Sequence, residues 1–354
     1  MQKHLTSMLR NINLRERWLN ILLILLLVLL IAFANVSGQI PKPPANTVTL
    51  NATIYLPTAT LQPILQSRVN QQIQSDNPGW VGSLIHPTVT KLTPQSHGLA
   101  MTLSQSLYPG SPQAIESSSL LQFSVLNSST VQVSAQPMSG SLLSLNGPLA
   151  QIKLPEGHLN SISPTPHCGD SALAVKMGLP ISTGQKQNAP QTNVGLPSEA
   201  IPRIPTQVAN AYVEVPSSAL SSLGHDIGSL PISDSLTAQN IDIGIQNNEI
   251  TVRSAISLWQ TGLVVGTSTM HIQPVVKNGN LLLHVKQTDA SALFFTFSAD
   301  SYNQQIEESL NQQMATALGG LFTVTTVAIG TADKHIPCMA SDSLILIGTT
   351  DMLS

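Results

Sequence analysis

The chain has 354 residues, a formal net charge of −3 and 9% charged residues, compared with roughly 25% in a typical soluble protein. Ser, Thr, Asn and Gln supply the polar surface instead, as is common in secreted proteins. After residue 17 the body is mildly acidic and has no basic cluster. This argues against a nucleic-acid partner and against charge-driven docking on anionic lipid.

The N-terminal segment combines a basic flank with an apolar run. Residues 18–36 have the sequence WLNILLILLLVLLIAFANV, with a strictly apolar centre from Ile21 to Phe33. The length of this centre fits a signal peptide, and the whole run is long enough to span a bilayer. The basic residues before it predict that the N-terminus lies inside the cytoplasm and the body outside. These residues are Lys3, Arg10, Arg15 and Arg17.

Two fates of this segment stay open. Ala32-Phe33-Ala34 fits the small-x-small cleavage pattern, and cleavage after Ala34 would release a secreted body. The long stretch before the apolar run, with Trp18 at the border, favours an uncleaved signal-anchor. We expect a single-pass protein of the cell membrane. Residues 1–17 would then be a cytoplasmic basic segment, 18–36 a transmembrane helix and 37–46 a tether.

A first β-rich module is predicted at residues 47–178. Alternating apolar residues indicate a strand at 48–56, which Pro57 ends. An amphipathic helix follows at about 60–74, because apolar residues recur there at helical spacing. The stretch 137–166 shows no clean pattern. Further strands are predicted at 99–107, 115–125, 131–135 and 173–177.

A Pro-rich linker at 179–207 and a second module at 208–354 complete the chain. Five prolines without periodicity mark the linker. The second module starts, like the first, with a strand (211–215) and a helix (217–223). A long helix is predicted at 302–318, ended by Gly319-Gly320. The remaining strands are predicted at 241–245, 250–258, 263–276, 281–285, 292–297, 322–326 and 343–347.

The two halves end alike. Cys168 precedes Asp170-Ser171, and Cys338 precedes Asp342-Ser343. We interpret this as duplication of one module. The predicted fold class is therefore α+β. It has two similar modules of curved antiparallel β-sheet packed on amphipathic helices, after one N-terminal transmembrane helix.

Cys168 and Cys338 are the only cysteines. Outside the cytoplasm such a pair normally oxidises, and equivalent module ends predict a disulfide between them. Two separate buried thiols are the alternative. A zinc site that adds His167 and His335 is a weaker one, since the chain has no C-x-x-C spacing. We therefore expect no metal site and no cofactor.

The second module resembles a known family. It contains the hairpin IDIGIQNNEITVRS at residues 241–254, then a long strand, the hairpin VVKNGNLLLHV at 275–285, and an amphipathic helix. This order is similar to the extracytoplasmic LmeA-like and YpmS-like proteins, which in turn resemble tubular lipid-binding (TULIP) modules. The resemblance implies a cupped sheet around a helix and an apolar groove for acyl chains. It defines no catalytic or binding residue.

The leading functional hypothesis is non-catalytic binding of a lipid or another apolar ligand. The candidate lining residues lie on the apolar stripes of the two predicted helices, although ordinary packing also explains such stripes. A structural or interaction ectodomain with no ligand cavity is the alternative, and the protein partner is then unknown. An extracytoplasmic hydrolase is a distant third, since the sequence has no catalytic motif. The candidates are Leu61, Leu65, Val69, Ile306, Leu310 and Met314.

Overall fold

The computed structural model describes most of the chain from Thr47 to Thr350. Residues 1–46, which include the expected membrane helix and tether, lie outside the described residues, as does most of the expected linker. In the part that is described, no helix is long and apolar enough to cross a membrane. The described residues are 47–80, 84–108, 111–127, 130–138, 145–154, 157–164, 172–182, 211–232, 236–246, 249–258, 261–292, 295–298, 303–304, 306–308, 310–311, 322–329 and 342–350.

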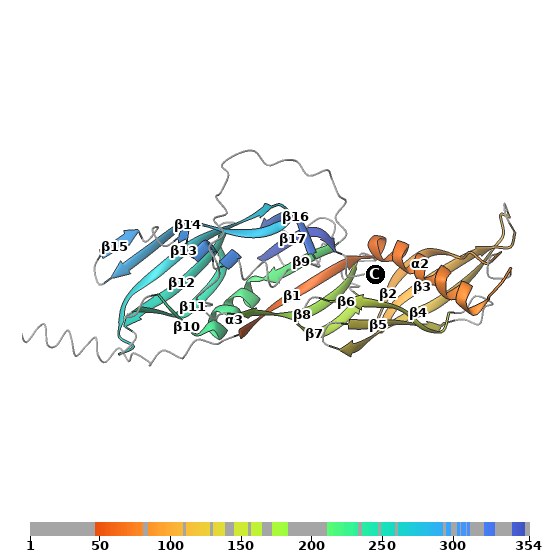
Figure 1. The fold of residues 1–354 in the computed structure, drawn as a ribbon, viewed down its shortest axis with the longest axis horizontal. Helices are drawn as coiled ribbons and strands as arrows, with labels where there is room; N and C mark the ends of the chain where they lie inside the picture. Colours follow the sequence, from red (N-terminus) through yellow and green to blue (C-terminus); the bar gives the residue numbers. More distant parts are fainter. Residues whose placement is uncertain are drawn as a thin grey trace, which may run out of the picture.

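Three antiparallel sheets follow one another along an elongated molecule (Figure 1). The middle one, the central sheet, has the strand order β16-β17-β9-β1-β8-β7 and so joins strands from both halves of the chain. The halves meet where β1 pairs with β9, from Thr53↔Glu214 to Tyr55↔Tyr212. The strands are β1 (Thr47–Pro57), β7 (His158–Pro164), β8 (Ala172–Ser182), β9 (Ala211–Pro216), β16 (Phe322–Ile329) and β17 (Ser343–Thr350).

The five-stranded sheet is a meander in the first half of the chain. Helix α2 (Thr58–Asp76) continues directly from β1 and contacts both edge strands of this sheet, β2 and β6, so the sheet curls around the helix. Figure 1 shows this unit at one end of the molecule. Its strands are β2 (Thr88–Gln95), β3 (Gly98–Ser106), β4 (Ala114–Asn127), β5 (Thr130–Pro137) and β6 (Gly147–Lys153).

The C-terminal sheet is the corresponding meander in the second half and forms the opposite end (Figure 1). Helix α3 (Ser217–Ile227) leads from β9 and packs against β11 and β1. At the β13–β14 turn, Asn278 and Gly279 both have positive φ angles, as a tight hairpin turn requires. The strands are β10 (Ser229–Pro231), β11 (Leu236–Gln246), β12 (Glu249–Leu258), β13 (Val264–Lys277), β14 (Asn280–Ala292) and β15 (Phe295–Ser298).

One hydrophobic core runs through all three sheets and includes Leu56, Leu103, Val213 and Ile250. The other face of the central sheet carries a smaller cluster around Tyr55. Because both faces of this sheet are covered, β17 is buried continuously from Ser343 to Leu346 rather than at alternate positions.

The structure adds one feature to the expected architecture. The two halves share a sheet, since each contributes three strands to the central sheet. Strand β8 also runs four residues into the segment expected to be a linker, from residue 179 to Ser182. Pro180 is tolerated there because it pairs with Thr49 of β1 and lies beyond the residues of β8 that pair with β7.

Candidate functional site

The buried face of α2 fills the interior of the five-stranded sheet. Leu61, Leu65, Val69 and Ile73 recur every four residues and are all buried. Opposite them lie the inward-facing residues of the sheet, among them the fully buried Leu99. Three predicted lining residues, Leu61, Leu65 and Val69, therefore do line this interior. Their role in holding a ligand stays a prediction.

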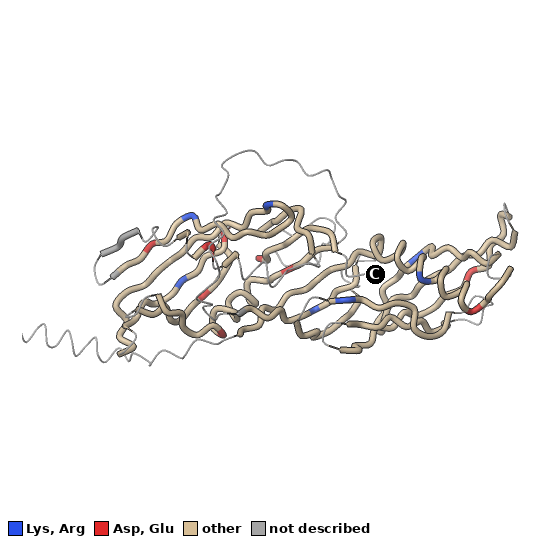
Figure 2. The backbone as a smooth tube through the Cα atoms, in the orientation of Figure 1, with Lys and Arg blue, Asp and Glu red and all other residues tan. Residues whose placement is uncertain are grey.

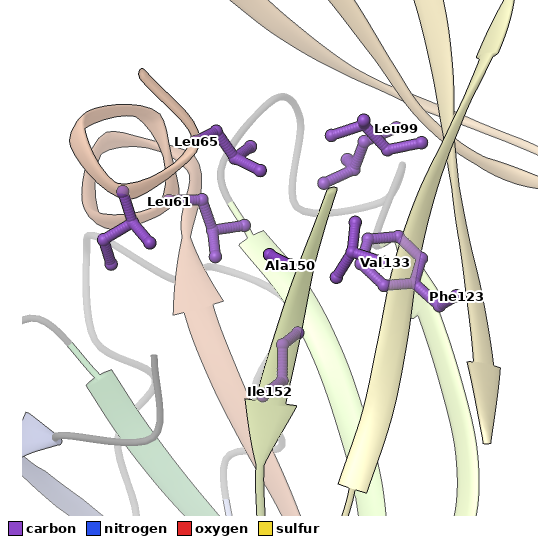
Figure 3. Close-up of a pocket in the computed structure, with 9 residues that line it drawn as sticks. Leu61, Leu65, Leu99, Phe123, Val133, Ala150 and Ile152 are labelled. Atoms are coloured by element: carbon purple, nitrogen blue, oxygen red, sulfur yellow. The ribbon is translucent and has the colours of Figure 1, made fainter. Parts of the chain in front are cut away.

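A small cavity of about 20 Å³ remains between α2 and the sheet. In Figure 3, Leu61 and Leu65 point from the helix toward side chains of the sheet. The cavity has room for about one water molecule, whereas ligand pockets typically have roughly 300–1,000 Å³. A chain-like ligand therefore needs α2 to move outward. The lining residues are Leu61, Ile64, Leu65, Leu99, Leu121, Phe123, Val133, Ala150 and Ile152, all apolar.

Side-chain amides hold α2 at the edges of the sheet. Gln62 Nε2 donates to the carbonyl of Val89 at 2.6 Å. Gln66 Nε2 donates to the carbonyl of Pro87 at 2.7 Å, and its Oε1 accepts from the Val89 N–H at 2.6 Å. Since β2 is an edge strand, these two glutamines satisfy backbone groups that a neighbouring strand would otherwise bind. The helix thus closes the open side of the curled sheet.

Helix α2 is weakly stabilised by its own sequence. Its N-cap, Pro57, makes no side-chain cap, and the helix has no acidic residue in its first turn and no basic residue in its last. Pro63 is the sixth residue of the helix, past the first turn in which a proline is harmless. Packing and the glutamine contacts, rather than capping within the helix, therefore hold α2 in place.

A second helix borders the C-terminal sheet. The described residues between 303 and 311 are helical, and we call them the C-terminal helical segment. Ile306 and Leu310 are half-buried and pack against the core, as the predicted stripe requires. Met314 lies outside the described residues. Because this segment lies against β14, the structure does not bring Ile306 and Leu310 together with the α2 residues.

The polar face of the C-terminal helical segment binds the open edge of β14. Asn311 Oδ1 accepts from the Leu283 N–H at 2.6 Å, and Glu307 Oε2 accepts from the Val285 N–H at 3.2 Å. Asn303 accepts from the Thr288 hydroxyl at 2.6 Å. Helical spacing indicated the apolar stripe, but only the structure shows that the polar residues at the same spacing bind a strand edge.

Polar clusters elsewhere are small. Glu249 lies 2.6 Å from Lys286 Nζ and 3.3 Å from His271 Nδ1. The hydrogen bond from Lys286 is the main cause that lowers the pKa of Glu249. The ion pair of Glu249 with Lys286 lies on the surface and therefore adds little stability. Among the described residues, no group of three or more His, Cys, Asp or Glu side chains could hold a metal ion.

Cys168 and Cys338 lie outside the described residues, so the expected disulfide stays a prediction. Among the described residues that follow them, Ala172 pairs with Pro57 and Ser343 pairs with Pro216. The register of the central sheet places these two anchor points roughly 25 Å apart, at opposite ends of the sheet. Four residues separate Cys168 from Ala172 and five separate Cys338 from Ser343, a combined reach of roughly 30 Å, so this spacing neither requires nor excludes a bridge. Thiol titration of the unfolded chain would settle the point.

Comparisons with known proteins give no family. No family model matches the chain, and no curated protein matches it. A crystal structure of P47 of Clostridium botulinum E1 aligns with 86% of this chain and 100% of its own, at 9% identity and a TM-score of 0.31. A crystal structure of lipopolysaccharide binding protein aligns with 85% and 98%, at 8% identity and a TM-score of 0.33. These TM-scores are too low to assign the fold, so the expected family stays a prediction.

Proposed function

We propose that this chain binds an apolar ligand, such as a lipid acyl chain, between α2 and the five-stranded sheet, without catalysis and outside the cytoplasm. The observation that carries the proposal is an interior lined only by apolar side chains. This interior is closed by a helix that side-chain amides hold at the sheet edge. Such a space offers a ligand no polar anchor, so affinity would come from burial of its methylene groups.

The free energies of the contacts involved favour outward movement of α2 when a ligand is present. Three hydrogen bonds join Gln62 and Gln66 to the β2 edge, and each has a net value of about 1 kcal/mol. Each buried methylene group of a ligand contributes about 0.8 kcal/mol. An acyl chain of about ten methylene groups therefore offsets the lost hydrogen bonds, while Leu61 and Leu65 exchange contacts with the sheet for contacts with the chain.

A packed interaction ectodomain is the second candidate. The observation that favours it is the volume of the cavity, about 20 Å³, which is far below that of an open ligand pocket. In this case α2 would stay closed, and the chain would act through its surface. The two candidates differ in whether α2 opens for an apolar chain.

A photo-crosslinking experiment tests the proposal. The full chain in vesicles would be exposed to a palmitate that carries a diazirine, and labelled peptides would be identified by mass spectrometry. We expect labelling on α2 and on β4 to β6. Ala150→Leu should reduce it about tenfold, because the added carbons displace about two ligand methylene groups. Gln151→Leu is the matched control, since Gln151 is the next residue on β6 and is exposed.

Two results would contradict the proposal. One is an absence of label on α2 and the sheet, which would favour the packed ectodomain. The other is equal labelling of Ala150→Leu and the parent chain, which would place the ligand elsewhere. Circular dichroism would confirm that Ala150→Leu is folded, since overpacking of a core costs about 1–3 kcal/mol.

A further inference from the structure

Four large apolar or aromatic side chains are exposed on two neighbouring turns. Trp80 is 76% and Leu84 64% exposed, between α2 and β2. Leu107 is 53% and Tyr108 62% exposed, between β3 and β4. The second turn is held by backbone hydrogen bonds from the N–H of Leu107 to Gln113 and from that of Ser111 to Tyr108. These bonds fix the positions of Leu107 and Tyr108, whose large side chains are exposed to solvent.

The two turns project from the same end of the five-stranded sheet. Gln66 binds the start of β2, and α2 continues beyond it for ten residues, about 15 Å, to Asp76. Thr88 at the start of β2 pairs with Ser104, and the chain runs about 13 Å further to Tyr108. Both turns thus extend past the sheet at the free end of the elongated molecule (Figure 1). We call Trp80, Leu84, Leu107 and Tyr108 the apolar tip.

The charges near the apolar tip are acidic. Asp76 ends α2, and Glu116 lies near the start of β4, and both are exposed. Arg68 precedes Asp76 by eight residues on α2, and Lys91 follows Thr88 on β2. Figure 2 shows that the acidic positions of this unit lie closer to its free end than the basic ones. An anionic surface would be repelled by this end of the molecule. A surface that is uncharged or zwitterionic would not be repelled by these acidic side chains.

We infer that the apolar tip inserts into the interface of a bilayer with zwitterionic head groups. Trp and Tyr with neighbouring leucines are the residues that settle at the boundary of head groups and acyl chains. A protein partner would need roughly 800 Å² on this side of a standard interface, more than four side chains on two turns offer. Insertion into a planar membrane, by contrast, needs only a narrow projecting end.

The apolar tip also lies at one end of the α2 interior. The buried stripe of α2 runs from Leu61 to Ile73, and Trp80 of the apolar tip follows the end of the helix at Asp76 by four residues. Insertion would therefore place this end of the interior at the level of the acyl chains. The idea that a ligand enters by this route rests on the proposed function. The contact of the apolar tip with a membrane does not depend on it.

Fluorescence of Trp80 tests the inference on the full chain, in vesicles of phosphatidylcholine with or without brominated acyl chains. The chain has three Trp, so the emission lost in Trp80→Phe is assigned to Trp80. We expect bromine to quench this component and vesicles to shift it to shorter wavelength. Leu84→Ser combined with Leu107→Ser should lower the fraction of quenched Trp80 about tenfold, equivalent to one leucine withdrawn from water.

Val125→Ser combined with Leu126→Ser is the matched control, because these residues are similarly exposed, at the opposite end of β4. It should leave the quenching unchanged. A Trp80 component that is neither quenched nor shifted would overturn the inference and leave the tip as a protein contact. An equal loss of Trp80 quenching in the control variant, Val125→Ser with Leu126→Ser, would also overturn the inference. Quenched Trp80 without palmitate crosslinks on α2 would support the tip and contradict the proposed function alone.

Discussion

The side chain of Glu214 is buried in the central sheet, where the two halves of the chain meet. Its carboxylate accepts a hydrogen bond from the Tyr55 hydroxyl at 2.7 Å and another from the Ser343 hydroxyl at 2.8 Å. Desolvation by burial raises the pKa of Tyr55 well above its ordinary value of 10.0, and the hydrogen bond and charge of Glu214 raise it further. The folded state therefore holds the Tyr55 proton more tightly than the unfolded state.

This raised pKa predicts the direction of a pH effect. The contribution of Tyr55 is complete below pH 10 and is lost as the pH rises above it, by about 1.4 kcal/mol per pH unit at most. Tyr55→Phe should lower the free energy of unfolding by about 1–3 kcal/mol at pH 8, because Glu214 loses a donor. Tyr55→Phe should also reduce the loss of unfolding free energy above pH 10, as measured by urea unfolding. Tyr108→Phe is the exposed control, and an unchanged decline in Tyr55→Phe would contradict the prediction.

Helix α2 and the C-terminal helical segment each bind a strand edge of a meander sheet in the same way. Gln62 and Gln66 of α2 bind the edge of β2, and Glu307 and Asn311 bind the edge of β14. In each case polar residues at four-residue spacing bind backbone groups of a strand, while apolar residues beside them reach the core. The helix thereby covers an edge that could otherwise pair with another chain.

Loss of one such contact should be visible in hydrogen exchange. Glu307→Ala leaves the Val285 N–H without its acceptor, so we expect that amide to exchange about tenfold faster, as loss of a bond of roughly 1.4 kcal/mol implies. Glu308→Ala is the matched control, since Glu308 is exposed and bonds within the helix to Gln304. Equal protection of Val285 in both variants would show that the helical segment does not hold this edge.

The central sheet makes the whole molecule one unit. Its strand order is symmetric about the β1–β9 junction, with β8 and β7 on one side and β17 and β16 on the other. This order is the pattern that duplication of one module would produce, and the duplication itself stays an interpretation. The junction spans three residue pairs, yet the hydrophobic core is continuous across it. Stability of the two halves should therefore be coupled.

Ile54→Ala tests this coupling. Ile54 is 2% exposed and pairs with Val213 across the junction, so the change should cost about 2–5 kcal/mol. Hydrogen exchange should become faster in both the five-stranded and the C-terminal sheet. Ile232→Ala, at a residue that is 45% exposed, should change stability by less than about 0.5 kcal/mol. Faster exchange in only one sheet would mean that the halves unfold independently.

Much of the secondary structure could be predicted because the local pattern is strong. Alternation located β1, β3, β4, β5 and β12, and helical spacing located α2. Strands β2, β6, β7 and β10 were missed. They are short, and the burial patterns of β2 and β7 do not alternate strictly. Their position is decided by neighbouring strands, which a local window does not contain.

The candidate site could be predicted in part. Leu61 and Leu65 were identified, since a helical stripe shows which face is buried. Phe123 lies within the strand predicted at 115–125, but no local pattern marks it as a neighbour of α2. Ala150 and Ile152 could not be found, because their strand β6 was missed. The exposure of Trp80 and Tyr108 has no signal in sequence, since aromatic residues are buried in most folds.

By itself, the sequence determined the antiparallel β-rich class, the strand-then-helix start of each half and the buried stripe of α2. The reason is that a period of two or of 3.6 residues shows which face of an element avoids water. Only the tertiary structure decided that the halves share a sheet, that amide side chains hold α2 closed and that the interior is nearly filled. These features depend on contacts between residues far apart in the chain, and periodicity carries no information about such partners.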